Sequence, residues 1–123
     1  MVDPRIIKAA KILVDWSTRV KKDDYVQIIT EPAAESLALE VYKLAIQKGA
    51  YPALKISLPG QSYIYYKYSS DEQLKRFPEI SMYEMKKTDV VIYIGAKENT
   101  RELSETDPKK VALRSKTTQK LSE

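Results

Sequence analysis

Three stretches of the chain have the hydrophobic pattern of strands. Val90–Ile94 is an unbroken apolar run that ends at Gly95, which is typical of a strand covered on both faces, as in a parallel sheet with helices above and below. Tyr25–Thr30 is predicted as another strand. In Tyr51–Leu58 apolar and polar residues alternate and Pro52 stands near the start, so this stretch suits an edge strand.

Helix start and stop signals lie around these strands. Asp3 followed by Pro4 marks the start of a first helix, with Asp3 as its N-cap. A second helix begins at Glu31-Pro32 and stops at Gly49, a residue type that readily takes the left-handed conformation after a last turn. Three more helices are predicted: after the capping-box spacing of Ser69 and Ser70 to Glu72 and Gln73, over Glu79–Lys87, and from Asp107-Pro108 onward.

The first helix has an apolar and a charged side. The positions expected in the core are Ile6, Ala10, Leu13 and Val20. The charged positions expected to face water are Arg5, Lys8, Lys11 and Asp15. The single tryptophan, Trp16, flanks the apolar side, and we expect it to anchor the core or a contact between elements instead of binding a ligand.

The alternation of helices and strands predicts the α/β class. We expect residues 1–123 to form a single domain with a small, mainly parallel sheet in strand order 2-1-3, flanked by helices on both faces. The strand order reverses between the first and third strands, and open sheets of this class bind ligands in the crevice at such a point. The residues predicted to line this crevice are Thr30, Glu31, Asn99, Thr100 and Arg101.

The second helix carries more apolar surface than one sheet face requires. Its expected core stripe is Leu37, Ala38, Val41, Leu44 and Ala45. A second stripe lies roughly 130° away at about 100° per residue, and consists of Leu39, Tyr42 and Ile46. Either neighbouring loops of the same domain cover this stripe or a partner surface does, and we name the three residues as interface candidates.

Tyrosine is concentrated in one short segment, residues 63–68, whose pattern does not distinguish strand from helix. The four tyrosines are Tyr63, Tyr65, Tyr66 and Tyr68. Packing within the domain, a protein–protein surface and a stacking platform for single-stranded nucleic acid are all compatible with them. Only Lys67 adds positive charge within the segment, which disfavours the third interpretation.

The composition excludes several kinds of active site. The chain has neither cysteine nor histidine, so it cannot build a Ser-His-Asp triad, a Cys-His pair or a typical zinc site. The lack of cysteine fits a reducing cytoplasm, where we expect the protein to reside. Abundant charge with a single asparagine is typical of thermophilic proteins. We expect no membrane association, since no apolar stretch approaches the ~20 residues that span a bilayer.

The net charge of +4 is located in one segment. Five basic residues follow one another without an intervening acid, and the rest of the chain sums to −1. They are Lys109, Lys110, Arg114, Lys116 and Lys120. We interpret the segment as a solvated tail, with residues 114–123 as a linker, in preference to a phosphate-binding arm, so nucleic acid is not the expected partner.

The candidate crevice offers binding groups but no catalytic pair. The turn after the first strand has no glycine, and Glu31 and Glu35 would repel phosphate, which argues against a dinucleotide site. Residues 99–101 could hold a carboxylate or phosphate, or could cap a helix. Three acids in the same stretch could bind Mg²⁺ or Ca²⁺, or form a solvated face: Glu98, Glu102 and Glu105. Taken alone, these residues indicate a binding or structural module and not an enzyme.

Several segments in succession resemble the amino-terminal part of the thermophilic metallo-aminopeptidases, the aminopeptidase T-like family. The matching segments are VDPRI, AKILVDWS, GAYPALKISLPG, YKYSSDEQL, ENTREL and DPKKVALRSK. The resemblance extends over residues 1–123. It implies an α/β domain that does not carry the catalytic centre but helps to shape access to it.

The resemblance also implies partners and cofactors. Such enzymes hold two divalent metal ions, of zinc or cobalt type, in a carboxyl-terminal catalytic domain that removes N-terminal residues from peptides. No position of this chain corresponds to those metal ligands, so we expect no cofactor and no catalytic residue here. The expected partners are the missing catalytic domain, a second copy of the chain, or both. The alternative is a free-standing module that binds a small ligand or another protein.

Overall fold

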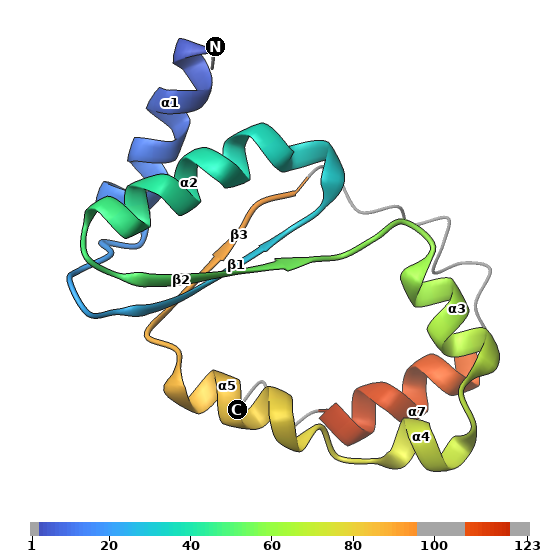
Figure 1. Ribbon diagram of the computed structural model, residues 1–123. Coiled ribbons are helices and arrows are strands. Elements are labelled where there is room, and N and C mark those ends of the chain that lie inside the picture. Colours follow the sequence, from blue (N-terminus) through green and yellow to red (C-terminus); the bar gives the residue numbers. More distant parts are fainter. Residues whose placement is uncertain (1–2, 96–107, 119–123) are drawn as a thin grey trace. The chain divides into compact units, whose positions relative to one another are not determined.

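A computed structural model of the chain describes residues 3–95 and 108–118. The chain divides into two compact units, Met1–Leu58 with Lys87–Lys97 and Pro59–Lys86 with Glu98–Glu123. The first contains the strands and is called the sheet unit below. The second consists of helices and is called the helical unit (Figure 1).

The sheet unit is built on three parallel strands. They are β1 (Tyr25–Thr30), β2 (Tyr51–Ile56) and β3 (Val90–Tyr93), in the order β2-β1-β3. The predicted class, α/β with a small parallel sheet in strand order 2-1-3 and flanking helices, is confirmed. β2 is an edge strand as expected, although it ends at Ile56 and not at Leu58.

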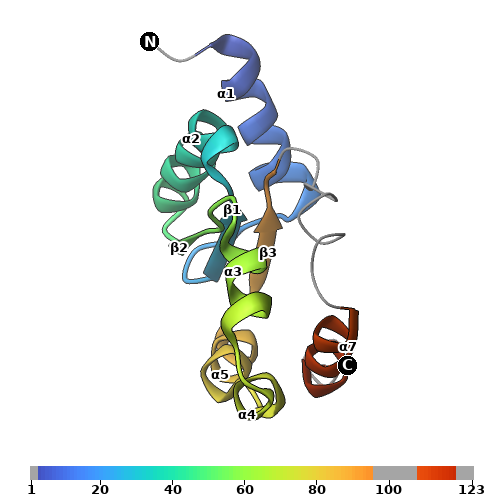
Figure 2. The same cartoon turned by 90° about the vertical axis from the view of Figure 1, so that its right-hand side faces the viewer.

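The two faces of the sheet differ in burial. Val26, Ile28 and Ile92 are buried and belong to the core together with Ala38 and Val41 of α2 (Glu35–Gln47). α2 contacts β1 and β2 and lies along the sheet (Figure 1 and Figure 2).

On the opposite face of the sheet, the rings of Tyr25 and Tyr51 lie 5.8 Å apart and both are exposed. Tyr93 of β3 is 73% exposed, although its neighbours Ile92 and Ile94 are buried. Within the described residues of the sheet unit, the expectation that the run Val90–Ile94 is covered on both faces is therefore wrong. An unbroken apolar run predicts burial but does not identify the element that covers the second face.

The first helix begins as predicted and then widens. α1 (Pro4–Lys11) starts after Asp3, whose Oδ1 accepts a hydrogen bond of 2.8 Å from the backbone N–H of Arg5. It continues as η1 (Ile12–Ser17), a segment of π-helix. The prediction that Trp16 anchors the core is wrong, because the side chain is 75% exposed while Val14 is fully buried. Residues two positions apart lie on opposite sides of a helix, so burial of Val14 turns Trp16 outward.

The second helix starts with a 3₁₀ turn, η2 (Pro32–Ala34), before α2. The predicted core stripe is confirmed, since its five residues are buried or packed against the core. Gly49 follows the last turn with φ +84°, as the stop signal predicts. The end of α2 is tied to η1 by an ion pair of 2.6 Å between Lys48 Nζ and Asp15 Oδ1.

The helical unit contains four described helices. They are α3 (Gln61–Tyr68), α4 (Asp71–Lys75), α5 (Glu79–Lys87) and α7 (Pro108–Thr118). The tyrosine segment is thus helical. The capping box before α4 is confirmed: Ser70 Oγ accepts from the Gln73 N–H at 3.2 Å, and the Ser70 N–H donates to Gln73 Oε1 at 2.9 Å.

α7 is joined to the other helices of this unit through its basic side chains. Lys110 Nζ donates to the backbone oxygens of Lys67 and Ser69 at 3.3 and 3.1 Å, and one Arg114 guanidinium nitrogen donates to the Arg76 oxygen at 3.0 Å. The interpretation of this segment as a solvated tail is therefore wrong for Lys110 and Arg114. Residues 114–118 of the predicted linker belong to α7. The connection of this segment to a further domain stays a prediction. None of the described helices is long and apolar enough to cross a membrane.

Candidate functional site

The predicted crevice lies where β1 and β3 end side by side. The Ile94 N–H donates to the Ile29 oxygen at 2.8 Å, which continues the pairing one residue past β3. Glu31 leaves β1 at the same end of the sheet. A Cβ on Gly95 would lie 3.9 Å from Glu31 Oε2, so the carboxylate rests directly beside this glycine. The crevice residues predicted from the sequence include Glu31 but not Gly95, although a glycine directly after a strand was a usable signal of close approach.

The described part of the crevice holds one hydroxyl and one carboxylate. Thr30 is buried, and its Oγ1 donates a long hydrogen bond of 3.4 Å to the backbone carbonyl oxygen of Glu31. Glu31 is half-buried. The other three predicted residues, Asn99, Thr100 and Arg101, lie outside the described residues, as do Glu98, Glu102 and Glu105. Thr30 and Glu31 can orient a donor or a cation, but they do not place a nucleophile beside a base.

The interface candidates on α2 differ in exposure. Leu39 and Ile46 are each about half exposed, whereas Tyr42 is partly buried and packs against the core. Loops of the sheet unit therefore do not cover the whole stripe. Leu39 and Ile46 remain open among the described residues, and whether a partner covers them stays a prediction.

The four candidate tyrosines of α3 belong to a cluster of rings and cations. Lys67 Nζ lies 5.5 Å from the ring centroid of Tyr63 and 5.6 Å from that of Tyr68. Arg114 Cζ of α7 lies 5.7 Å from the ring centroid of Tyr65. The rings of Tyr65 and Tyr66 meet edge to face at 5.1 Å. Tyr68 is exposed, and the other three rings are half-buried.

Two pKa values respond to these contacts. The hydrogen bond with Tyr63, together with the electrostatic effect of Tyr63 and Tyr68, raises the pKa of Lys67. Burial raises the pKa of Tyr66, with Tyr65 adding to the shift and Arg114 opposing it. Sequence reasoning counted Lys67 alone as charge near the tyrosines. It missed Lys110 and Arg114, because only folding places α7 beside α3 and α4.

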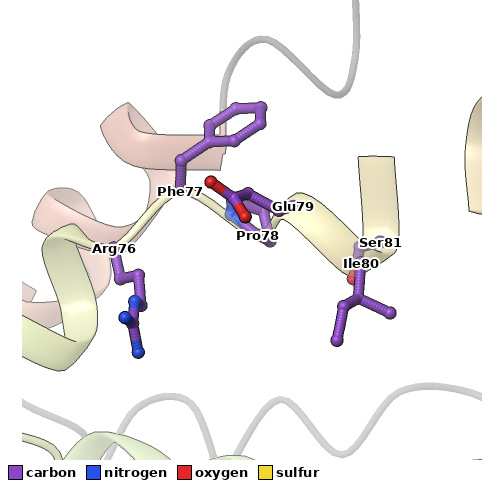
Figure 3. A pocket seen from close by; sticks show the side chains of 6 residues that line it. All are labelled: Arg76, Phe77, Pro78, Glu79, Ile80 and Ser81. Carbon is purple, nitrogen blue, oxygen red and sulfur yellow. The ribbon is translucent and has the colours of Figure 1, made fainter. Parts of the chain in front are cut away.

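An open hollow of about 330 Å³ lies at the connection between α4 and α5 (Figure 3). Arg76 and Ile80 point to the same side, and Phe77 points to the other (Figure 3). The other residues that line the hollow are Pro78, Glu79 and Ser81. One cation, one carboxylate and one hydroxyl can bind polar groups, yet they do not form a catalytic pair or a metal site.

Within residues 3–95 and 108–118, no three or more His, Cys, Asp or Glu side chains gather closely enough to hold a metal ion. The clusters described above can bind and position other molecules by hydrogen bonds, charge and apolar contact. They cannot supply the ligand set of a typical hydrolytic metal centre.

Comparisons with known proteins agree with this fold. The family model of thermophilic metalloproteases (M29) matches residues 2–123. The structure of wild-type AmpT from Thermus thermophilus is similar, with a TM-score of 0.72 and 14% sequence identity, over 92% of this chain and 30% of that chain. The chain thus spans about 30% of the length of that structure. No curated protein matches the chain.

Proposed function

Because the chain belongs to the thermophilic metalloprotease family (M29), we propose that it is the amino-terminal, non-catalytic domain of a metal-dependent aminopeptidase. The parent enzyme would remove N-terminal residues from peptides. In this proposal the chain shapes access to a catalytic centre that other parts of the enzyme provide. It also contributes contacts to a catalytic domain or to a second copy.

One observation carries the proposal: a member of a metallopeptidase family has no histidine and no cysteine in its 123 residues. Metal-dependent peptidases commonly bind their metal through histidine. The carboxylates of the described residues do not gather in threes either. The metal of the family therefore does not fit the described part of this chain, and we derive no catalytic step from it.

Exposed apolar surface supports the proposed contacts. Leu39 and Ile46 on α2 and Tyr68 on α3 are exposed. Large apolar side chains in contiguous patches usually mark places where another surface binds. We propose that the second stripe of α2 (Leu39, Tyr42 and Ile46), called the α2 stripe, and the α3 tyrosines take part in contacts between domains or copies.

The lack of cysteine is in keeping with our expectation of a cytoplasmic protein.

An activity assay tests the proposal. The purified chain is mixed with aminoacyl-anilides in the presence and absence of Co²⁺ or Zn²⁺, and circular dichroism verifies that it is folded. We expect no metal-dependent release of the aniline. Release that requires the metal and disappears with a chelator would show that the chain has a hydrolytic centre of its own and would contradict the proposal.

A second candidate function rests on Glu31 at the sheet crevice. The half-buried carboxylate beside Gly95 could bind a small cationic ligand if the chain acts as a free-standing module. A ligand that binds the folded state raises its melting temperature. A rise with free amino acids or amines that disappears in Glu31→Gln and Arg101→Ala would favour this function over the first.

A further inference from the structure

One face of α3 presents three exposed side chains of different character. Ile64 is 57% and Tyr68 is 72% exposed, and the two are neighbours on the helix surface because they lie four positions apart. Lys67 is exposed beside them, and its Nζ lies over the Tyr63 and Tyr68 rings. We call Ile64, Lys67 and Tyr68 the α3 face.

Basic side chains meet at the last turn of α3. Lys67 belongs to the α3 face, and α7, which contains four Lys or Arg and no acid, supplies another. Lys110 of α7 reaches the last turn of α3, where it binds the oxygens of Lys67 and Ser69. An anionic ligand is therefore attracted to the end of α3 that carries Lys67 and Tyr68.

The arrangement of rings and cations distinguishes between anionic ligands. A single-stranded nucleic acid needs free aromatic faces on which bases stack. Here Lys67 lies over Tyr63 and Tyr68, and Arg114 lies over Tyr65, so a protein cation lies over one face of each of these three rings. Ile64 has no π face to offer a base. An apolar side chain of a peptide, in contrast, packs well on Ile64 and on the edge of Tyr68.

We propose that the α3 face is a docking site for acidic peptides, which bind with a carboxylate at Lys67 and an adjacent apolar side chain on Ile64 and Tyr68. The peptide is a substrate of the parent enzyme, so this inference rests on the proposed function and names a substrate class for the access route. The site positions the substrate and takes no part in the chemistry.

Binding of labelled peptides to the full chain tests the site by fluorescence anisotropy. The probe is a short peptide of alternating leucine and glutamate with an amidated C-terminus. Its neutral counterparts replace glutamate by glutamine, with either an amide or a free carboxylate at the C-terminus. We expect the acidic peptide to bind, and its affinity to fall as salt is added. If the acidic peptide binds, additional binding of the glutamine peptide with a free C-terminus, but not of its amide, further supports a carboxylate site.

Matched variants locate the binding to α3. Lys67→Gln removes one exposed charge, for which we expect the dissociation constant to rise about fivefold, as for an exposed ion pair. Ile64→Ser and Tyr68→Ser remove the apolar contact and weaken binding while leaving Lys67 in place. Lys8→Gln makes the same change of charge on α1 in the sheet unit, and we expect it to leave the affinity unchanged.

Four results would overturn the proposal. They are equal binding of the acidic and the amidated glutamine peptides, equal effects of Lys67→Gln and Lys8→Gln, tighter binding of an oligouridylate than of the acidic peptide, and no binding of any peptide. These results are independent of the anilide assay, since a chain that binds no peptide and also lacks turnover still agrees with a non-catalytic domain.

Discussion

The carboxylate of Asp89 accepts a hydrogen bond of 2.8 Å from the backbone N–H of Tyr25, which lies 64 residues earlier in the chain. The Asp89 N–H in turn donates to the Tyr25 oxygen at 2.8 Å. Two hydrogen bonds thus join the starts of β1 and β3. They align the strands so that their other ends meet at Glu31 and Gly95.

Replacing Asp89 should destabilise the sheet unit. Asp89→Ala removes a charged acceptor from the Tyr25 N–H, and we expect a loss of about 1 kcal/mol in the free energy of unfolding. Asp89→Asn keeps an acceptor oxygen without the charge and should lose less. Urea denaturation followed by circular dichroism measures both. Equal stability of Asp89→Ala and the unchanged chain would show that the hydrogen bond contributes nothing.

The two left-handed glycines should respond differently to substitution. Gly49 has φ +84° and Gly60 has φ +90°, so alanine at either position strains the backbone by about 1 kcal/mol. A Cβ at Gly49 would also lie 3.0 Å from Lys22 Cγ, whereas nothing lies within 4 Å of one at Gly60. We therefore expect Gly49→Ala to lower the melting temperature more than Gly60→Ala does. When each glycine variant is combined with Lys22→Ala, the difference between their melting temperatures should become smaller. An unchanged difference would mean that the contact with Lys22 is not its cause.

The capping box of α4 should contribute measurably to the helical unit. Ser70→Ala removes the acceptor for the Gln73 N–H, and loss of such a cap costs about 1 kcal/mol. Hydrogen exchange at the amides of α4 should become faster. Ser62→Ala replaces an exposed serine within α3 and serves as the control, for which we expect little change. Unchanged exchange in Ser70→Ala would indicate that tertiary contacts alone hold α4.

The N-cap of α1 should depend on pH. Hydrogen bonds from the side chain and the backbone of Arg5 lower the pKa of Asp3 below its ordinary value of 3.8. Because the folded-state pKa is the lower one, the stabilisation is present above the unfolded-state pKa and is lost as pH falls through the folded-state value. The melting temperature of the unchanged chain should exceed that of Asp3→Ala at neutral pH, and the difference should shrink below pH 3.8. A difference that does not vary with pH would contradict this origin.

Self-association should involve the α2 stripe. We expect sedimentation velocity to detect association that increases with protein concentration, because Leu39 and Ile46 are open to solvent. The double variant Leu39→Gln, Ile46→Gln should shift the chain towards the monomer. Ile12→Gln changes an apolar residue of similar exposure on η1 and should leave association as it is. An equal effect of the control would mean that the association is unspecific.

Local signals in the sequence predicted much of the secondary structure. Asp3-Pro4, Gly49 and the Ser70–Gln73 pair act through the backbone of their immediate neighbours, so their effects follow from a few consecutive residues. The predicted strand order, which the structure confirms, followed from the assignment of Tyr51–Leu58 as an edge strand on its alternating pattern and Pro52. Of the predicted crevice, the structure places Thr30 and Glu31 at the expected end of the sheet, beside Gly95. The other three predicted residues lie outside the described ranges.

By itself, the sequence determined the α/β class, the helix boundaries set by caps, and the exclusion of histidine- and cysteine-dependent chemistry. Each of these depends on residue identity or on short-range spacing. Only the tertiary structure decided that Trp16 and Tyr93 are exposed, that Glu31 rests beside Gly95, and that α7 brings Arg114 to the ring of Tyr65. These relationships join residues far apart in the chain or depend on which surfaces remain uncovered, and hydrophobic periodicity records neither.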